Sequence, residues 1–212
     1  MDASLQLLAF VFLNQALTTA IWWGAGTWLG LSRRAARHWV VAGLANGISL
    51  TLTVVNGGLQ NTPQMLTAAA IAVLGCISIR RGMQAFLRIR HTDRSHIMLG
   101  LGLCVFNFGV CIPQNWLVAG MLAGGVVACS VLLACARETF NPIAREYSRG
   151  MAHAHNVIMA SSASVFGGVT LTAVLPDVRW PWYHFSPQAG QFALVFTCVS
   201  LAILSSVLLL YF

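Results

Sequence analysis

Residues 116–136 read WLVAGMLAGGVVACSVLLACA, an unbroken apolar run that Arg137 follows directly. The hydrocarbon core of a bilayer is about 30 Å thick, and roughly 20 apolar residues of helix cross it. Six further stretches have a similar character, and the seven predicted spans lie near residues 5–31, 39–59, 64–86, 96–112, 116–136, 151–175 and 191–212. The sequence therefore predicts an all-α, polytopic bundle of seven transmembrane helices that forms a single domain over residues 1–212.

The composition of the chain supports a membrane protein. Of its 212 residues 58% are hydrophobic and only 8% are charged, whereas an ordinary soluble domain carries about 25% charged residues. This balance excludes a simple soluble enzyme, a disordered protein and a nucleic-acid-binding domain. The net charge of +7 comes from 12 basic residues that are all arginine, so their placement decides what the charge means.

Eleven of the 12 arginines fall at the end of the first, third or fifth predicted span or in the connection that follows it. These three connections share one side of the membrane, and the positive-inside rule makes that side cytoplasmic. The N-terminus is then outside and the C-terminus inside. The arginines themselves are interpreted as the residues that set this topology: Arg33, Arg34, Arg37, Arg80, Arg81, Arg88, Arg90, Arg94, Arg137, Arg145 and Arg149.

The sequence contains no recognisable catalytic, cofactor or metal site. The six cysteines form no CxxC pair, and His153 and His155 are two residues apart, so on a helix they point to different faces. Asp93, Glu138 and Glu146 are assigned to inner loops. With no carboxylate at mid-membrane, the sequence argues against ion-coupled transport, which commonly uses one.

Uncharged polar residues form a stripe along the second span. Asn46, Ser49, Thr53, Asn56 and Gln60 follow one another at helical spacing, and the stripe should face inward because lipid offers an amide no hydrogen-bond partner. Two interpretations stay open: hydrogen bonds between helices, worth roughly 0.6–2 kcal/mol each, or a pocket for a small or amphipathic ligand that opens outward. The candidate ligand-binding residues in the outer half are Asn14, Thr18, Thr53, Asn56, Gln60, Asn107, Gln114, Trp116, Trp182 and Tyr183.

Two pairs of glycines, Gly43 with Gly47 and Gly120 with Gly124, have the spacing that lets membrane helices approach closely. They predict structural contacts between helices. Pro113, Gln114 and Asn115 predict a tight hairpin between the fourth and fifth spans.

The last predicted span ends at Tyr211 and Phe212 with no polar residue after it, whereas arginine follows each other inward-going span. A helix that delivers its end to the cytoplasm usually has a charged flank. We therefore expect residues 1–212 to be the N-terminal part of a longer protein.

Short motifs mark the ends of several predicted spans. Trp28-Leu-Gly-Leu precedes Arg33-Arg34, Arg80-Arg81-Gly82 closes the third span, and the last span begins near Phe192-Ala-Leu-Val-Phe196. In this layout the chain resembles the seven-span N-terminal sensory regions that precede GGDEF domains in many bacterial diguanylate cyclases. The resemblance implies a signal-input module in the bacterial inner membrane, working as a homodimer, whose last helix leads to a cytoplasmic cyclase domain that makes cyclic di-GMP. The chain itself has no GGDEF sequence, so no catalytic residue is carried over and residues 1–212 are expected to be no enzyme.

The function predicted from these observations is a membrane-embedded sensory domain. Its partners are the lipid bilayer, a second copy and a small or amphipathic ligand at the outer face, with no cofactor and no nucleic acid. The alternatives are a small transporter or channel, and a non-catalytic scaffold subunit.

Overall fold

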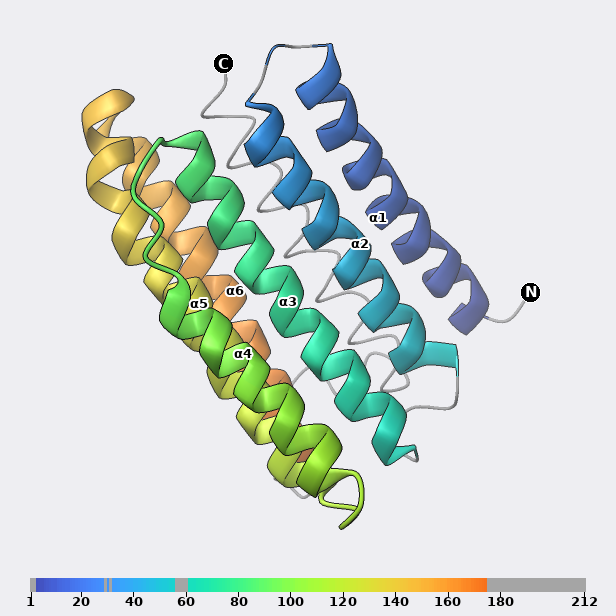
Figure 1. Ribbon diagram of the computed structural model, residues 1–212. Coiled ribbons are helices and arrows are strands. Elements are labelled where there is room, and N and C mark those ends of the chain that lie inside the picture. The colour runs from blue at the N-terminus through green and yellow to red at the C-terminus, as the bar shows by residue number, and fades with distance from the viewer. Residues whose placement is uncertain (1–2, 29, 31, 56–60, 175–212) are drawn as a thin grey trace.

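The computed structural model describes residues 3–28, 30, 32–55 and 61–174, and these form an all-helical bundle in which no strand occurs (Figure 1). The predicted seventh span at residues 191–212 lies outside the described residues. The elements are α1 (Ala3–Thr27), α2 (Arg33–Val55), α3 (Thr62–Phe86), α4 (Arg94–Phe106), the π-helical turn η1 (Asn107–Cys111), α5 (Leu117–Glu146) and α6 (Arg149–Val174).

Each of the six predicted spans within the described residues corresponds to a helix. Three helical segments are long and apolar enough to cross a membrane, namely α3, α4 continued by η1, and α5. The largest boundary difference is at the end of α5, which continues ten residues beyond Ala136 to Glu146. The apolar run stops at Ala136, but a helix continues where its polar residues find partners.

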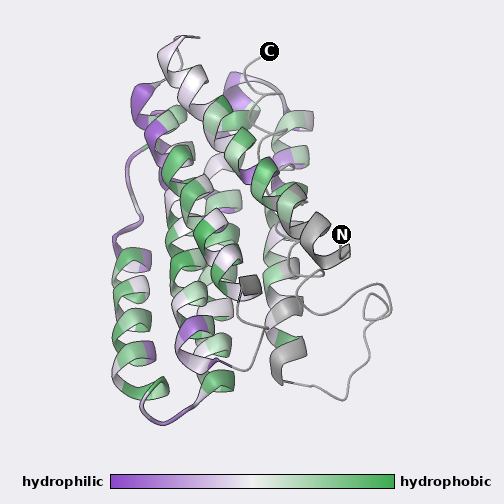
Figure 2. Ribbon diagram, turned by 90° about the vertical axis from the view of Figure 1, so that its right-hand side faces the viewer, coloured by the Kyte–Doolittle hydropathy of each residue, from purple (hydrophilic) through white to green (hydrophobic). Residues whose placement is uncertain are grey.

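The helices pack in the order α1, α2, α3, α5, α6, and α4 with η1 lies over α3 and α5 (Figure 1). Consecutive helices run antiparallel, so α1, α3 and α5 end where α2 and α6 begin. We call this end the arginine-rich end. Figure 2 shows hydrophobic residues along most of the helices and hydrophilic residues gathered towards this end.

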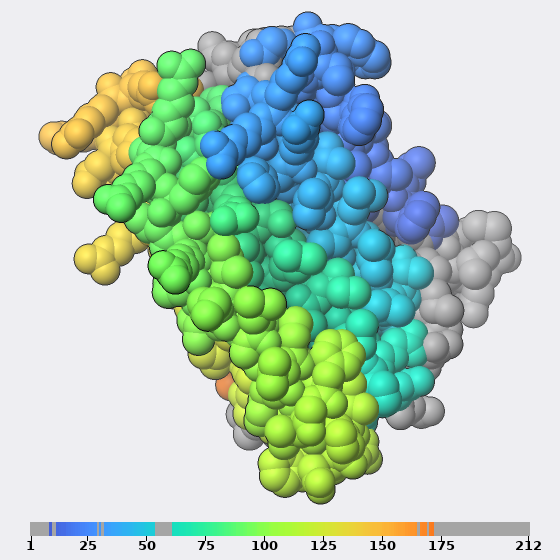
Figure 3. Space-filling view, viewed as in Figure 1, coloured from blue at the N-terminus to red at the C-terminus, as the bar shows by residue number. Residues whose placement is uncertain are grey.

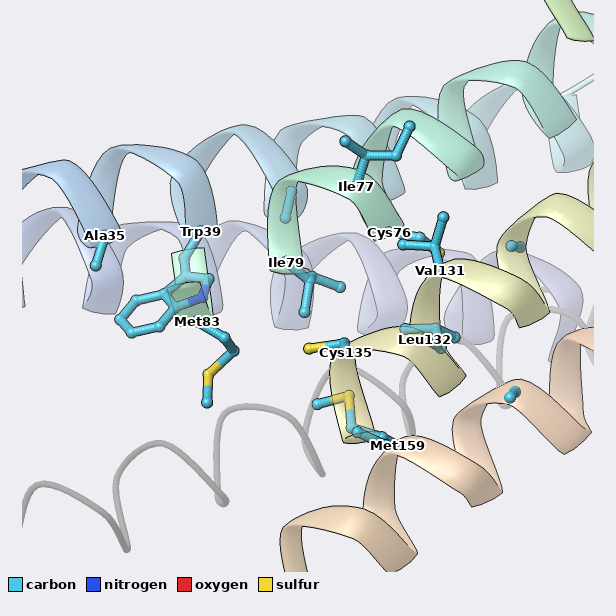
Figure 4. Close-up of a cluster of buried hydrophobic side chains, with 14 of the residues drawn as sticks. Ala35, Trp39, Cys76, Ile77, Ile79, Met83, Val131, Leu132, Cys135 and Met159 are labelled. Atoms are coloured by element: carbon cyan, nitrogen blue, oxygen red, sulfur yellow. The ribbon is translucent and has the colours of Figure 1, made fainter. Parts of the chain in front are cut away.

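The main hydrophobic core joins α3, α5 and α6. Met83, Cys135 and Met159 come from these three helices and are fully buried, and Figure 4 shows them close together. Trp39 of α2 extends this core towards α1, because its ring centroid lies 4.3 Å from that of Trp22. Burial of these side chains stabilises the packing of α2, α3, α5 and α6 around one core.

The glycines predicted to bring helices together do so. A Cβ atom at Gly43 would clash with Thr19 of α1, and one at Gly120 would clash with Leu66 of α3. A third position, Gly82 of α3, is covered by the indole ring of Trp39 in the same way. Small residues therefore set the spacing of α1, α2, α3 and α5, as expected for helices packed without a large apolar driving force.

The hairpin predicted at residues 113–115 is confirmed. The amide of Trp116 donates to the carbonyl of Cys111 at 2.8 Å, and Asn115 takes a φ of 56°, in the left-handed region that asparagine tolerates. The preceding π-turn lets the side-chain amide of Asn107 donate to the carbonyl of Leu66 on α3 at 3.3 Å. The hairpin is thereby fixed to α3.

Candidate functional site: a buried charged network

A buried ion pair joins α3 and α5 near the arginine-rich end. The Nε atom of Arg80 donates to Oε2 of Glu138 at 3.0 Å, and its Nη2 atom donates to Oε1. Arg80 is 2% exposed, and the Glu138 side chain is 27% exposed. This two-point geometry is the strongest form of an arginine–carboxylate contact.

Three further side chains complete the hydrogen bonds of the pair. Gln84 donates to Glu138 at 3.1 Å, and Thr92 donates to it at 2.6 Å. The carboxylate thus accepts four hydrogen bonds, which is its full capacity. We name the group of Arg80, Gln84, Thr92, His96 and Glu138 the charged network.

His96 supplies the last partner of the arginine. Its Nδ1 atom lies 2.5 Å from Nη1 of Arg80. An arginine has only donors, so Nδ1 must accept and carries no proton. The geometry therefore requires the neutral His96 tautomer with its proton on Nε2.

A second ion pair lies next to the charged network. It joins the exposed side chain of Arg81 to the buried carboxylate of Asp93. His38 of α2, one residue before the predicted span, lies beside this pair. Partial burial, followed by the positive charges of Arg81 and Arg34, lowers the pKa of the His38 imidazole. His38 is therefore neutral near pH 7 and adds no charge against Arg81.

The segment between α3 and α4 explains how the network is covered. Arg88, two residues after the end of α3, takes a φ of 52°, and Ile89 donates back to the carbonyl of Gln84 at 3.0 Å. This is the Schellman-type ending of a helix. The chain then runs back along the bundle (Figure 1), which places Thr92 on Glu138.

The charged network corrects the prediction that Glu138 lies in an inner loop. Arg80 is six residues before the end of α3 and Glu138 eight before the end of α5, so both lie about 9–12 Å inside the helix ends. A sequence signal was present: Glu138 continues the buried stripe of Val131 and Cys135 on α5. The partner of that stripe could not be read from the sequence.

The described members of the predicted outer pocket fall into two groups. Thr18 and Thr53 are buried and Asn14 is half-buried on α1 and α2. Asn107 is buried, and Gln114 and Trp116 are exposed, at the hairpin beyond α3. Because α2 packs against α1 and α3 while η1 packs against α3, α4 and α5, α3 separates the groups. Asn56, Gln60, Trp182 and Tyr183 lie outside the described residues, and the pocket remains a prediction.

The inward orientation of the polar stripe on α2 is confirmed for Asn46, Ser49 and Thr53, which are all buried. Ser49 donates to the carbonyl of Ala68 on α3 at 2.8 Å. In return, Gln64 of α3 donates to the carbonyl of Leu52 at 2.9 Å. These contacts support the interpretation as hydrogen bonds between helices.

The two histidines of α6 point to different faces, as predicted. His153 is exposed and its ring lies 5.0 Å from that of Phe140. His155 is buried, with 1% of its surface exposed, and neither ring nitrogen has a hydrogen-bond partner. The reason is that α6 presents Ala152, His155 and Met159 as one buried stripe to the core.

The chain matches no protein-family model, and no curated protein or solved structure matches it either. The site must therefore be interpreted from its own chemistry. Its cationic and anionic groups are satisfied by each other, and these contacts join α3, α4 and α5.

Proposed function

We propose that this chain is a membrane-embedded sensory domain of a bacterial signalling protein. It has seven spans, its arginine-rich end faces the cytoplasm, and its last helix relays the signal to a cytoplasmic output domain, a diguanylate cyclase. The charged network is the observation that carries the proposal. The lipid bilayer, a second copy of the chain and a small or amphipathic ligand at the outer face are its proposed partners.

The energetics of the charged network support a regulatory role. A buried ion pair is often no more stabilising than well-packed apolar residues of the same volume, and ionisable residues within membrane segments are expensive and commonly functional. The value of the pair lies in its geometry. Arg80, Glu138 and His96 belong to three helices, so a shift of any one helix breaks satisfied hydrogen bonds. Such an element has discrete arrangements that a signal can bias.

The polar contacts away from the network support the input side of the proposal. Neutral hydrogen bonds join helices at Ser49, Gln64 and Asn107. Breaking any one of them costs little free energy. A ligand or a change in the bilayer that favours another helix packing at the end opposite the arginine-rich end would act on the charged network through α3.

The orientation is tested with alkaline phosphatase, which is active only outside the cytoplasm. Fusions after Gln114 are expected to be active and fusions after Arg90 inactive. The reverse pattern would place the arginine-rich end outside and overturn the topology.

The signalling role is tested on the native gene. A tag at the start of the chromosomal gene is expected to label a membrane protein far heavier than the 22.8 kDa of these residues, carrying the output domain. In that strain Glu138→Gln is expected to change the cellular level of cyclic di-GMP. Arg137→Gln, which removes the neighbouring exposed charge, is the control and should leave the level unchanged.

Two other outcomes would replace the proposal. A labelled band at 22.8 kDa, together with solute flux through liposomes that contain the purified chain, would favour a small transporter or channel. The same band without flux, and with a larger complex that copurifies, would favour a scaffold subunit.

A further inference from the structure

A long groove follows the seam between α1 and α2. It consists of a hollow of about 670 Å³ between residues such as Phe12, Ala20 and Gly47, and a second of about 610 Å³ nearer the arginine-rich end. Trp23 lines both hollows, so they adjoin each other along the seam. Among the described elements α1 packs against α2 alone, and both helices lie along one edge of the molecule in the space-filling view (Figure 3).

The walls of the groove are apolar and exposed. Phe12 is 59% exposed, Trp23 64% and Ile48 52%. Gly43 and Gly47 of α2 line the floor of the first hollow, where they let α1 pack closely. Exposed apolar side chains around a concave surface favour an apolar occupant.

The end of the groove is positively charged. Arg33 and Arg37 line the hollow and lie one helical turn apart on α2. Both arginines are exposed. In the described part of the chain, the carboxylates that form ion pairs are Glu138 and Asp93, and they bind Arg80 and Arg81 instead. The arginines stand at the first turns of a 23-residue helix, whose positive dipole end adds to their attraction for an anion.

The groove is long enough for the acyl chain of a lipid. Arg33 and Leu52, at the two ends of the α2 wall, are 19 residues apart, or roughly 28 Å along a helix. One leaflet contributes about 15 Å of hydrocarbon, half of the bilayer core. The groove thus extends from the headgroup level through one whole leaflet.

We propose that the α1–α2 seam is a binding site for an anionic phospholipid of the inner leaflet. Arg33 and Arg37 bind the phosphate and the negative headgroup, and one acyl chain lies in the groove over Gly43 and Gly47. The inference rests on the membrane orientation proposed above but on no part of the signalling role. An ordered lipid here would couple the composition of the inner leaflet to the packing of α1.

The test uses the purified chain in a neutral detergent and native mass spectrometry. Phosphatidylglycerol and phosphatidylcholine with identical acyl chains are titrated separately, so that only the headgroup charge differs. The chain is expected to bind phosphatidylglycerol about 30-fold more tightly, the effect of two arginines at a membrane surface. The variant R33Q/R37Q is expected to lose this preference.

Matched variants separate a defined site from general attraction. R145Q/R149Q removes two exposed charges from the same end and should keep the 30-fold preference. A16L/A20L fills the groove from exposed positions of α1 and should weaken the binding of both lipids, whereas Ala154→Leu on α6 should not.

Three results would overturn the inference. Equal losses in R145Q/R149Q and R33Q/R37Q would mean diffuse charge attraction, and unchanged lipid binding in A16L/A20L would mean that the groove holds no acyl chain. A dimer that excludes lipid and dissociates in A16L/A20L would assign the seam to a second copy. Because the titration needs no output domain, each of these failures is distinguishable from a failure of the signalling proposal in cells.

Discussion

Two of the helices that pack on α3, namely α2 and α5, are held to it by different kinds of interaction. Against α2, the contact consists of fitted small residues and neutral hydrogen bonds, as where Gly82 lies under Trp39 and Ser49 donates to Ala68. Against α5, the contact contains the ion pair of Arg80 and Glu138. The first contact depends on shape and tolerates the loss of any one hydrogen bond, whereas the second depends on complete pairing and fails when one partner is removed.

The largest expected effect comes from removing one side of the ion pair. Glu138→Leu leaves the charge of Arg80, which is 2% exposed, without its counter-charge, and such a loss costs about 3–5 kcal/mol. Arg80→Met should cost less, because the carboxylate it leaves behind is 27% exposed and can be hydrated. Denaturation with sodium dodecyl sulfate in mixed micelles, followed by tryptophan fluorescence, gives the free energies of unfolding.

The double variant R80M/E138L sharpens this prediction. Replacing both charges by apolar groups is often close to neutral, so the double variant should be more stable than Glu138→Leu alone. If the two losses simply add, the pair is not coupled and the α3–α5 contact does not differ in kind from the α2–α3 contact.

A middle-sized effect is expected where the α2–α3 contact is tightest. Gly82→Ala places a methyl group against the indole of Trp39, and overpacking of this kind costs about 1–3 kcal/mol. The same unfolding measurement applies, and the emission of Trp39 should shift. Gly102→Ala on α4, where a Cβ meets nothing within 4 Å, is the control and should not destabilise the protein.

The smallest effect is expected at a single neutral hydrogen bond. Ser49→Ala removes the bond to Ala68 on α3 and should cost about 0.6 kcal/mol, the average measured for such bonds in membranes. Ser164→Ala removes a hydroxyl that bonds only within its own helix and should cost less. A loss at Ser49 as large as that at Glu138 would erase the contrast between the two contacts.

Sequence patterns predicted much of the helical layout because apolar length and polar spacing are local properties. The helices at 64–86 and 151–175 are close to α3 and α6, and the inward stripe on α2 follows from spacing alone. The predicted boundary failed at α5, where Arg137 interrupts the apolar run but the helix continues through Glu138. A hydropathy scale gives a charged residue the same value whether its charge is hydrated by water or paired with another side chain.

The sequence by itself determined an all-α chain of apolar helices, the glycines that let them approach, and the position of arginine at the end of every second apolar stretch. Each of these follows from the residue types and their spacing along one helix. Only the tertiary structure decided that Arg80 meets Glu138, 58 residues away, and that the polar candidates Thr53 and Asn107 lie on different sides of α3. The physical reason is that pairing depends on which helix faces are neighbours, and helix order in a bundle is set by packing between distant segments.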